Sequence, residues 1–261
     1  MKSVARRVSD GAVLALIKAW LQTAVEEDDG HGGKRRTTVA KDRGRGTLQG
    51  APISPLLSNL YMRRFVLGWK KLGWEEKLQA RLVVYADDFV ILCRSRAEEA
   101  RKQMQAIMST LKLTVNEQKT RICQVPQESF DFLGYTIGRC YSPKDGRAFI
   151  GTRPSRKRIG AICQSISQMT RPSFYWKTVE EMVEELNRTL RGWGNYFSLG
   201  AVSRAYRAVD HHARHRLRQW LNGKHRSQGA HPVRYAPLTL HRDLGLLRLA
   251  PTTGNRSCAK A

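Results

Sequence analysis

Two short runs of β-branched and aromatic residues lie close together in the chain, at residues 81–85 and 89–93. Such runs favour β-strands, and only Ala86, Asp87 and Asp88 separate them, a pattern typical of a hairpin. The sequence therefore predicts two paired strands with two adjacent aspartates at the turn between them.

Two adjacent carboxylates at such a turn are costly to hold, because like charges crowd together unless a cation neutralises them. Mg²⁺, with Mn²⁺ as a substitute, suits this role because it prefers oxygen ligands. Nucleotide addition uses two such metals about 4 Å apart, one activating a primer 3′ hydroxyl and one holding a triphosphate. The plain alternative is an ordinary turn, since aspartate is common in turns.

The charge of the chain is strongly positive, with 46 Lys and Arg against 22 Asp and Glu and a formal net charge of +24. Residues 139–261 carry a net charge of +16, and residues 1–138 carry +8. Such an excess indicates a polyanionic partner held by phosphate contacts and counterion release, with nucleic acid as the first candidate. The alternatives are a solvated basic surface without a partner and an anionic membrane.

The five cysteines form no C-x-x-C pair, so the sequence predicts neither a zinc site nor a disulfide framework. Reduced thiols of a cytoplasmic protein fit best. No apolar run approaches the roughly 20 residues that cross a bilayer, and residues 1–7 are not followed by a signal core. We therefore expect a soluble cytoplasmic protein without a membrane partner.

The first part of the chain mixes helical and strand patterns. Helices are expected over residues 9–25, 56–67 and 97–111, and short strands over residues 113–115, 122–125 and 130–137. Ser9 and Asp10 are candidates for the N-cap of the first helix. Residues 26–46, rich in glycine and charge, are expected to form a hairpin or loop, and residues 116–120 a turn.

From Pro154 onward the strand signals fade. Three helices are expected there, over about 154–170, 178–198 and 203–222. The boundary between the two parts is placed in the loop of residues 141–146, which contains Pro143 and Gly146. The expected fold class is α+β, with a mixed part followed by an all-helical part.

Four short motifs follow one another along the chain: Gln49-Gly50-x3-Ser54-Pro55, Tyr85-Ala86-Asp87-Asp88, Asn116-x2-Lys119-Thr120 and Phe132-Leu133-Gly134. Their order and rough spacing resemble those of group II intron reverse transcriptases and maturases. The resemblance implies that Asp87 and Asp88 are catalytic metal ligands. It also implies a primer grip at Phe132, Leu133 and Gly134, and contacts to substrate or template by Gln49, Gly50, Ser54, Pro55, Tyr85, Ala86 and Lys119.

A further segment, Leu190-Arg191-Gly192-Trp193-Gly194-Asn195-Tyr196-Phe197, resembles the L-R-G-W-x-N-Y-F signature of the maturase thumb, or domain X. Plain helix packing by its aromatic residues is the alternative. The resemblance implies phosphate contacts between this part and intron RNA or the template duplex. The residues expected to make them are Arg156, Lys157, Arg158, Arg188, Arg191, Arg204, Arg207, Arg214, Arg216 and Arg218.

The resemblance also implies an architecture and an activity. Residues 1–145 are expected to form a partial right-hand polymerase palm, an antiparallel sheet with helices. An all-α three-helix thumb would follow over residues 146–224, and then a short basic tail over residues 225–261. The implied activity is that of an RNA-directed DNA polymerase with maturase function, which uses deoxynucleoside triphosphates, a DNA primer and an RNA template.

The sequence allows more than one role for Lys119 and for three histidines. Lys119 is either a general acid, a triphosphate clamp or a solvated lysine. His211, His212 and His215 share one expected helix, where an i, i+4 pair can bind a metal. Because arginines crowd these histidines, a partly protonated surface that faces RNA is the more economical interpretation.

The first metal-binding aspartate of the family lies in an F-D-x-I-type segment, which is not found ahead of Ser9. Asp10, Asp28, Asp29 and Asp42 lack a matching context, so only two of three carboxylates are assigned. We therefore expect little primer extension by this chain alone, and a separate upstream polypeptide as a partner. The alternative is a non-catalytic splicing factor that binds intron RNA, or a degenerate remnant. No Cys/His array of an H-N-H endonuclease is found, so DNA cleavage is not expected.

Overall fold

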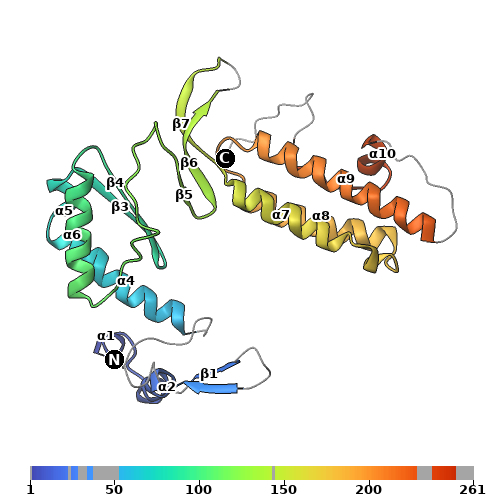
Figure 1. Cartoon of the computed structure of the whole chain (residues 1–261). Coiled ribbons are helices and arrows are strands. Elements are labelled where there is room, and N and C mark those ends of the chain that lie inside the picture. The colour runs from blue at the N-terminus through green and yellow to red at the C-terminus, as the bar shows by residue number, and fades with distance from the viewer. Residues whose placement is uncertain are drawn as a thin grey trace. The chain divides into compact units, whose positions relative to one another are not determined.

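A computed structural model describes residues 2–22, 25–28, 34–37, 53–142, 145–227 and 237–250 (Figure 1). The chain divides into two compact units, Met1–Ile122 and Cys123–Ala261. Helices and small antiparallel sheets occur together, as expected for an α+β protein.

The first unit contains the metal-site candidate. Its elements are α1 (Lys2–Ala5), α2 (Gly11–Gln22), β1 (Val25–Asp28), β2 (Lys34–Thr37), α4 (Ser54–Lys71), α5 (Trp74–Lys77), β3 (Ala80–Tyr85), β4 (Asp88–Cys93) and α6 (Ala97–Thr110). The expected hairpin is confirmed, because β3 and β4 pair antiparallel. The start of α2 is also confirmed, since Asp10 Oδ1 accepts the main-chain N–H groups of Ala12 at 2.8 Å and Val13 at 3.2 Å.

One face of the β3–β4 hairpin is covered by α4 and α6. Phe65 and Trp69 of α4 are fully buried, and the ring centroids of Phe65 and Phe89 are 5.1 Å apart. Leu82 and Val84, which alternate along β3, pack against the same core. Val83 and Tyr85 point the other way, and Tyr85 is 63% exposed. The core therefore fixes which face of the hairpin meets solvent.

The strands expected at residues 113–115 and 122–125 are wrong, because no strand forms there in the described chain. Leu113 and Val115 do pack against the core of the first unit, but their backbone joins no ladder. The segment that begins at Gln124 closes on itself instead. The N–H of Glu128 donates to the Gln124 carbonyl at 2.7 Å, and the Gln124 N–H donates to Glu128 Oε2 at 2.8 Å. Local hydrogen bonds replace strand pairing here.

The second unit consists of a small sheet and a helical bundle. Its elements are β5 (Phe130–Phe132), β6 (Tyr135–Tyr141), β7 (Ala148–Pro154), α7 (Arg156–Met169), the 3₁₀ helix η1 (Pro172–Phe174), α8 (Val179–Tyr196), α9 (Ser203–Ser227) and α10 (Pro237–Arg242). The three long helices confirm the expected helical stretches. The single strand expected over residues 130–137 is instead two strands folded about Leu133 and Gly134, and β7 was not expected.

The expected domain boundary at residues 145 and 146 falls inside a hairpin. β6 and β7 pair continuously, from Tyr135 opposite Pro154 to Tyr141 opposite Ala148. The compact second unit keeps this hairpin together with the helices. The domain limits of 1–145, 146–224 and 225–261 stay predictions, but the polypeptide chain has no structural break at the first of them.

The helices α7, α8 and α9 lie side by side around a shared apolar core (Figure 1). Ile166, Leu186, Leu190 and Leu217 are fully buried within it. Each such side chain stabilises the bundle by about 1.5–3 kcal/mol. Between the strands and the bundle, β7 leads directly into α7, whose N-cap Ser155 accepts the main-chain N–H of Arg158 at 3.3 Å.

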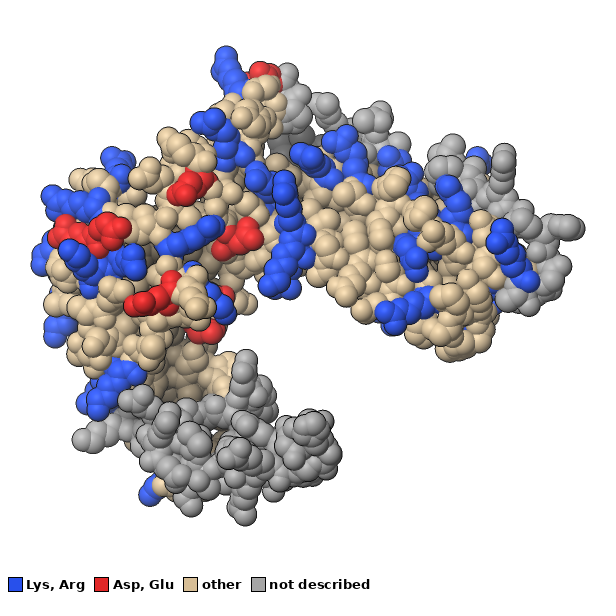
Figure 2. Space-filling model, viewed as in Figure 1, with Lys and Arg blue, Asp and Glu red and all other residues tan. Residues whose placement is uncertain are grey.

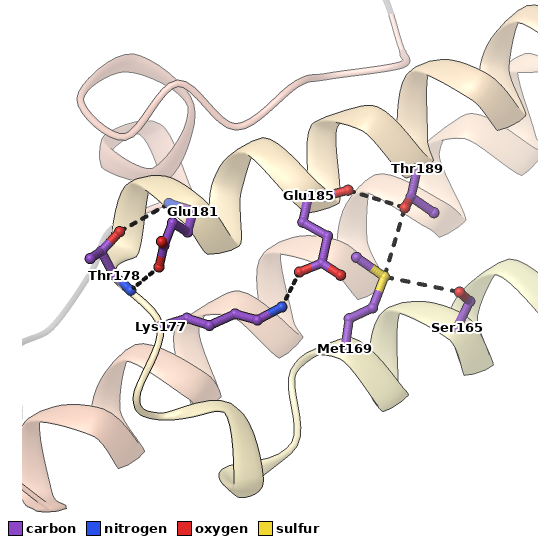
Figure 3. A network of polar contacts seen from close by, with 7 residues as sticks. All are labelled: Ser165, Met169, Lys177, Thr178, Glu181, Glu185 and Thr189. Atoms are coloured by element: carbon purple, nitrogen blue, oxygen red, sulfur yellow. Dashed lines mark hydrogen bonds and ion pairs between the residues drawn. The ribbon is translucent and has the colours of Figure 1, made fainter.

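Polar contacts fix the junction between α7 and α8 (Figure 3). Thr178 and Glu181 form a capping box, in which each side chain accepts the main-chain N–H of the other residue. Just before it, the Lys177 ammonium pairs with Glu185 on the second turn of α8. The Thr189 hydroxyl approaches the sulfur of Met169 at 3.7 Å, which brings the middle of α8 against the end of α7.

Part of the segment expected as a basic tail belongs to the bundle core. Leu246 and Ala250 are buried. The Asn187 side chain donates to the Gly245 carbonyl at 2.9 Å and accepts the Leu247 N–H at 2.6 Å. The buried Asp210 carboxylate accepts the N–H groups of Leu249 and Ala250, both at 2.9 Å. Two side chains therefore tie residues 245–250 to α8 and α9.

We expect Asp210→Ala to lower the free energy of unfolding of the second unit by about 2–4 kcal/mol, because one buried and one partly buried N–H group lose their acceptor. Urea denaturation followed by far-ultraviolet circular dichroism measures this change. Asp243→Ala, which removes an exposed carboxylate nearby, should change stability by less than about 0.5 kcal/mol. Equal effects of the two substitutions would contradict the assignment.

Candidate functional site

The two aspartates lie at the exposed end of the β3–β4 hairpin. Tyr85 and Asp88 are paired across the strands, and Ala86 and Asp87 form the turn between them. Ala86 has a φ of 51°, in the left-handed region that tight hairpin turns require. Both aspartates are exposed, and Asp88 shares its face of the hairpin with Tyr85 because the two are opposite each other.

This arrangement fits a hard divalent cation. Asp87 and Asp88 offer neighbouring carboxylate oxygens to solvent, and such oxygens are the ligands that Mg²⁺ prefers. In the part of the chain that the structure describes, no group of three or more His, Cys, Asp or Glu residues gathers around a common point. Asp10 serves as a helix cap, while Asp29 and Asp42 lie outside the described residues.

The motif ahead of the hairpin is described only in part. Gln49 and Gly50 lie outside the described residues. Ser54 and Pro55 are the first residues of α4, where proline fits because its missing N–H would have no helical partner. The α4 helix then supplies Phe65 to the core beneath the hairpin. The motif is thus linked through one helix to the hairpin that holds the aspartates.

Lys119 lies in the expected turn. Its N–H donates to the Oδ1 and the carbonyl of Asn116, each at 3.2 Å, and the Thr120 N–H donates to the same carbonyl at 3.0 Å. The turn is therefore closed by Asn116, and the Lys119 side chain is exposed. An exposed ammonium is compatible with each of its three expected roles, which stay predictions.

The Phe132-Leu133-Gly134 motif contacts the thumb-like signature directly. The Tyr196 hydroxyl donates to the Leu133 carbonyl at 3.0 Å. A Cβ atom at Gly134 would lie 3.2 Å from Phe197 Cζ and 3.1 Å from Arg158 Nε, so this position favours glycine. Two motifs that are distant in sequence, with Leu133 and Tyr196 63 positions apart, therefore form one piece of structure.

Plain helix packing, the alternative interpretation of the Leu190–Phe197 signature, holds for some of its aromatic residues. Phe197 is 4% exposed, and its ring centroid lies 4.9 Å from that of Trp193 and 5.1 Å from that of Tyr135. Arg191 points to solvent, and Tyr196 is 58% exposed. The signature therefore combines core packing with an exposed polar edge.

The expected phosphate-binding residues differ in how exposed their side chains are and in whether their charged groups already contact other residues. Arg156, Lys157, Arg158, Arg188, Arg191, Arg204 and Arg207 are exposed, while Arg214, Arg216 and Arg218 are half-buried. Arg188 forms an ion pair with Glu184 at 3.2 Å. Arg216 differs from the expectation, because its guanidinium donates to the carbonyls of Ser167 at 3.1 Å and Thr170 at 3.2 Å. It caps the end of α7.

A basic stripe runs along α9. Arg204, Arg207, His211, His215 and Arg218 recur every three or four residues and so share one side of the helix. The acid of this helix, Asp210, is buried and bonded to main-chain N–H groups. On the face seen in Figure 2, the bundle displays Lys and Arg side chains and no acidic ones.

The three histidines do not act as a set. His211 and His215 are exposed, whereas His212 turns toward α7, where its Nε2 lies 2.9 Å from the Ser167 hydroxyl. Burial lowers the pKa of His212, and the nearby Arg216 acts in the same direction. The interpretation as a partly protonated surface that faces RNA therefore does not fit His212, whose ring faces α7 instead.

Two parts of the chain match known protein families. Residues 6–137, about half of the chain, match the family described as reverse transcriptase (RNA-dependent DNA polymerase). Residues 159–236 match the group II intron, maturase-specific domain. The chain belongs to the group II intron reverse transcriptases. In this reverse transcriptase chain, the first match contains the Asp87-Asp88 hairpin and the second contains most of the helical bundle.

A curated relative is consistent with this family. Protein YkfC of Escherichia coli (strain K12) is 26% identical over 188 residues, which cover 60% of this chain. The same alignment covers 47% of YkfC, so the chain spans about half the length of that relative.

Cys93, Cys123, Cys140 and Cys163 are free thiols, and burial raises the pKa of Cys93 and Cys163.

Among the described residues, no helix has the length and apolar character needed to cross a membrane.

Two residues that hold the Leu133-Gly134 turn were not predicted from the sequence. The Tyr135 hydroxyl donates to the Tyr196 carbonyl at 2.6 Å, and the Ser155 N–H donates to the Gly134 carbonyl at 2.9 Å. The Leu133-Gly134 pair between alternating apolar residues was a usable hairpin signal. No local pattern marks the bonds from Tyr135 to Tyr196 and from Ser155 to Gly134, because these partners are distant in sequence.

The lowered pKa of His212 predicts a pH dependence. A lowered folded-state pKa gives stability that is fully present above about pH 6.5 and is lost as the pH falls through the folded value. We therefore expect the stability difference between wild type and His212→Gln to shrink from pH 7.5 to pH 5. Urea denaturation at several pH values measures it. His215→Gln, at an exposed position, should keep the wild-type pH profile, and a constant wild-type advantage would contradict the prediction.

Proposed function

We propose that Asp87 and Asp88 are metal ligands of an RNA-directed DNA polymerase site, and that the helical unit is its RNA-binding maturase part. The observation that carries the proposal is the presentation of two adjacent carboxylates at the exposed end of a hairpin whose other face is fixed by Phe65 and Trp69. A fixed hairpin suits catalysis because it keeps charged ligands in place without reorganisation.

The residues around the aspartates receive complementary roles. Bound Mg²⁺, or Mn²⁺, would supply charge stabilisation for attack of a primer 3′ hydroxyl on a deoxynucleoside triphosphate, with release of pyrophosphate. Tyr85 offers an exposed ring beside Asp88, which suits contact with the base pair being formed. Ala86 leaves the turn unobstructed. We propose template or nucleotide contacts for Gln49, Gly50, Ser54, Pro55 and Lys119.

Nucleic acid is the proposed partner of the second unit. The Phe132-Leu133-Gly134 turn would contact the primer, and the basic residues would hold the phosphates of intron RNA or of the template duplex. The α9 stripe supports this assignment because it places several cations in line without a solvent-exposed acid among them. A-form RNA is recognised largely through such backbone contacts.

We expect Asp87→Asn and Asp88→Asn to reduce primer extension by about a hundredfold or more, since metal coordination supplies several kcal/mol. Extension is measured on an RNA template with the chain alone, and again with a polypeptide that carries an F-D-x-I-type segment. Because two of three carboxylates are assigned, we expect extension mainly in the second case. Robust extension by the chain alone would contradict that expectation.

The controls separate catalysis from binding. Glu98→Gln, an exposed carboxylate on α6, should leave extension unchanged. Binding of intron RNA should be unchanged in both aspartate variants. A chain that binds intron RNA but extends primers in neither assay would favour the second candidate, a non-catalytic splicing factor, which the basic stripe on α9 also permits.

We expect the pair Arg204→Gln and Arg207→Gln to weaken RNA binding roughly tenfold and to lower the slope of log affinity against log salt by about one for each residue. Filter binding over a salt series measures both quantities. Lys102→Gln is the control, because it removes an exposed cation on α6 of the first unit, away from the α9 stripe. An unchanged salt slope in the Arg204 and Arg207 variant would place the RNA elsewhere.

A further inference from the structure

The Leu133-Gly134 turn is a strained structure that needs outside support. Leu133 has a φ of 51° and Gly134 a φ of 81°, so both residues of the turn are in the left-handed region. A non-glycine residue in this region costs about 1 kcal/mol or more, because its Cβ approaches the following carbonyl. The turn therefore keeps this conformation only where its surroundings favour it.

Both carbonyls of the turn accept hydrogen bonds from the helical part of the second unit. The Tyr196 hydroxyl, on the last turn of α8, donates to the Leu133 carbonyl at 3.0 Å. The main-chain N–H of Ser155, the N-cap of α7, donates to the Gly134 carbonyl at 2.9 Å. The conformation of the turn is thus tied to two helix ends.

A second tyrosine makes the reciprocal contact, from β6 to the end of α8. The Tyr135 hydroxyl donates to the carbonyl of Tyr196 at 2.6 Å. The two rings are stacked, with centroids 6.3 Å apart and planes 28° from parallel. Each tyrosine therefore holds the main chain at or beside the other, and we name this reciprocal pair the tyrosine latch.

The latch lies at the surface and is separate from the bundle core. Tyr196 is 58% exposed, whereas Leu186 and Leu190 on the same helix are fully buried. Loss of one exposed hydroxyl should therefore leave the helices folded. Arg158 and Phe197 limit movement of Gly134 in their direction, so without the latch the turn gains freedom mainly at Leu133.

We propose that Tyr196 and Tyr135 are positioning residues, which set the place of the primer end by fixing the Leu133-Gly134 turn to the end of α8. This inference rests on the proposed function, in which the turn contacts the primer. It gives the maturase unit a role beyond RNA affinity. The arginines hold the duplex through its phosphates, while the latch determines where the primer terminus lies.

The test uses the whole 261-residue chain and two measurements that need no turnover. The first is amide hydrogen exchange at Leu133, Gly134 and Tyr135. The second is the fluorescence of 2-aminopurine placed at the 3′ end of a DNA primer annealed to an RNA template. Tyr196→Phe retains the ring and removes only the hydroxyl.

We expect Tyr196→Phe to speed exchange at the turn by about fivefold or more and to change the fluorescence of the bound primer terminus. Its duplex affinity should stay within about twofold of wild type, since the phosphate contacts remain. Tyr135→Phe should have the same effects. The double variant should add little to either single one, because the two hydroxyls act as one unit.

Tyr206→Phe is the matched control for a merely structural loss. Its hydroxyl bonds to carbonyls at the end of α8 but not to the turn, so turn exchange and terminus fluorescence should stay at wild-type values. Wild-type behaviour of Tyr196→Phe in both measurements, with normal duplex binding, would overturn the latch and leave the proposed function standing. A wild-type chain that does not bind the duplex would overturn both.

Discussion

Burial of one face of the β3–β4 hairpin is the constraint on which the metal-site candidate depends. Two strands alone are marginally stable in water, so the hairpin needs apolar cover. Phe65 and Trp69 provide it from α4, and Met104 and Met108 contribute from α6. Because the cover is on one side only, the alternating residues of β3 divide strictly between core and solvent. Asp87 and Asp88 are then exposed to solvent at the end of a hairpin whose other face is buried.

The second unit faces a different problem, which is how to fold with so much positive charge. Its helices gather around apolar residues, and several cations are used internally. Arg216 caps the end of α7, and the Lys224 ammonium donates to the carbonyls of Tyr175 at 2.6 Å and Lys177 at 2.7 Å. These cations neutralise partial negative charge on main-chain carbonyls. Other cations, such as those along α9, are exposed, and in our proposal they bind an outside polyanion.

Residues of the two family matches contact each other within the second unit. The reverse transcriptase match ends at residue 137, within β6, and the maturase match begins at residue 159, within α7. Tyr135 belongs to the first match and Tyr196 to the second, and their hydroxyls bridge the two. This contact joins the Phe132-Leu133-Gly134 motif to the Leu190–Phe197 signature. In our proposal, primer placement depends on both.

The sequence by itself determined the family, the Asp87-Asp88 hairpin and the three long helices. These features rest on local information, namely alternating apolar residues, helical periodicity and short motifs in a fixed order. Capping residues such as Asp10 were likewise readable, because a cap bonds to residues only two or three positions away.

Only the tertiary structure decided which polar residues act on distant partners. Asp210 and Asn187 hold residues 245–250, and the pKa of His212 is lowered because its ring is partly buried against α7. The tyrosine latch depends on hydrogen bonds across more than sixty residues. Nothing in the local pattern of a tyrosine or an aspartate reveals such a partner, because hydrogen bonds of this kind are set by how the chain folds back on itself.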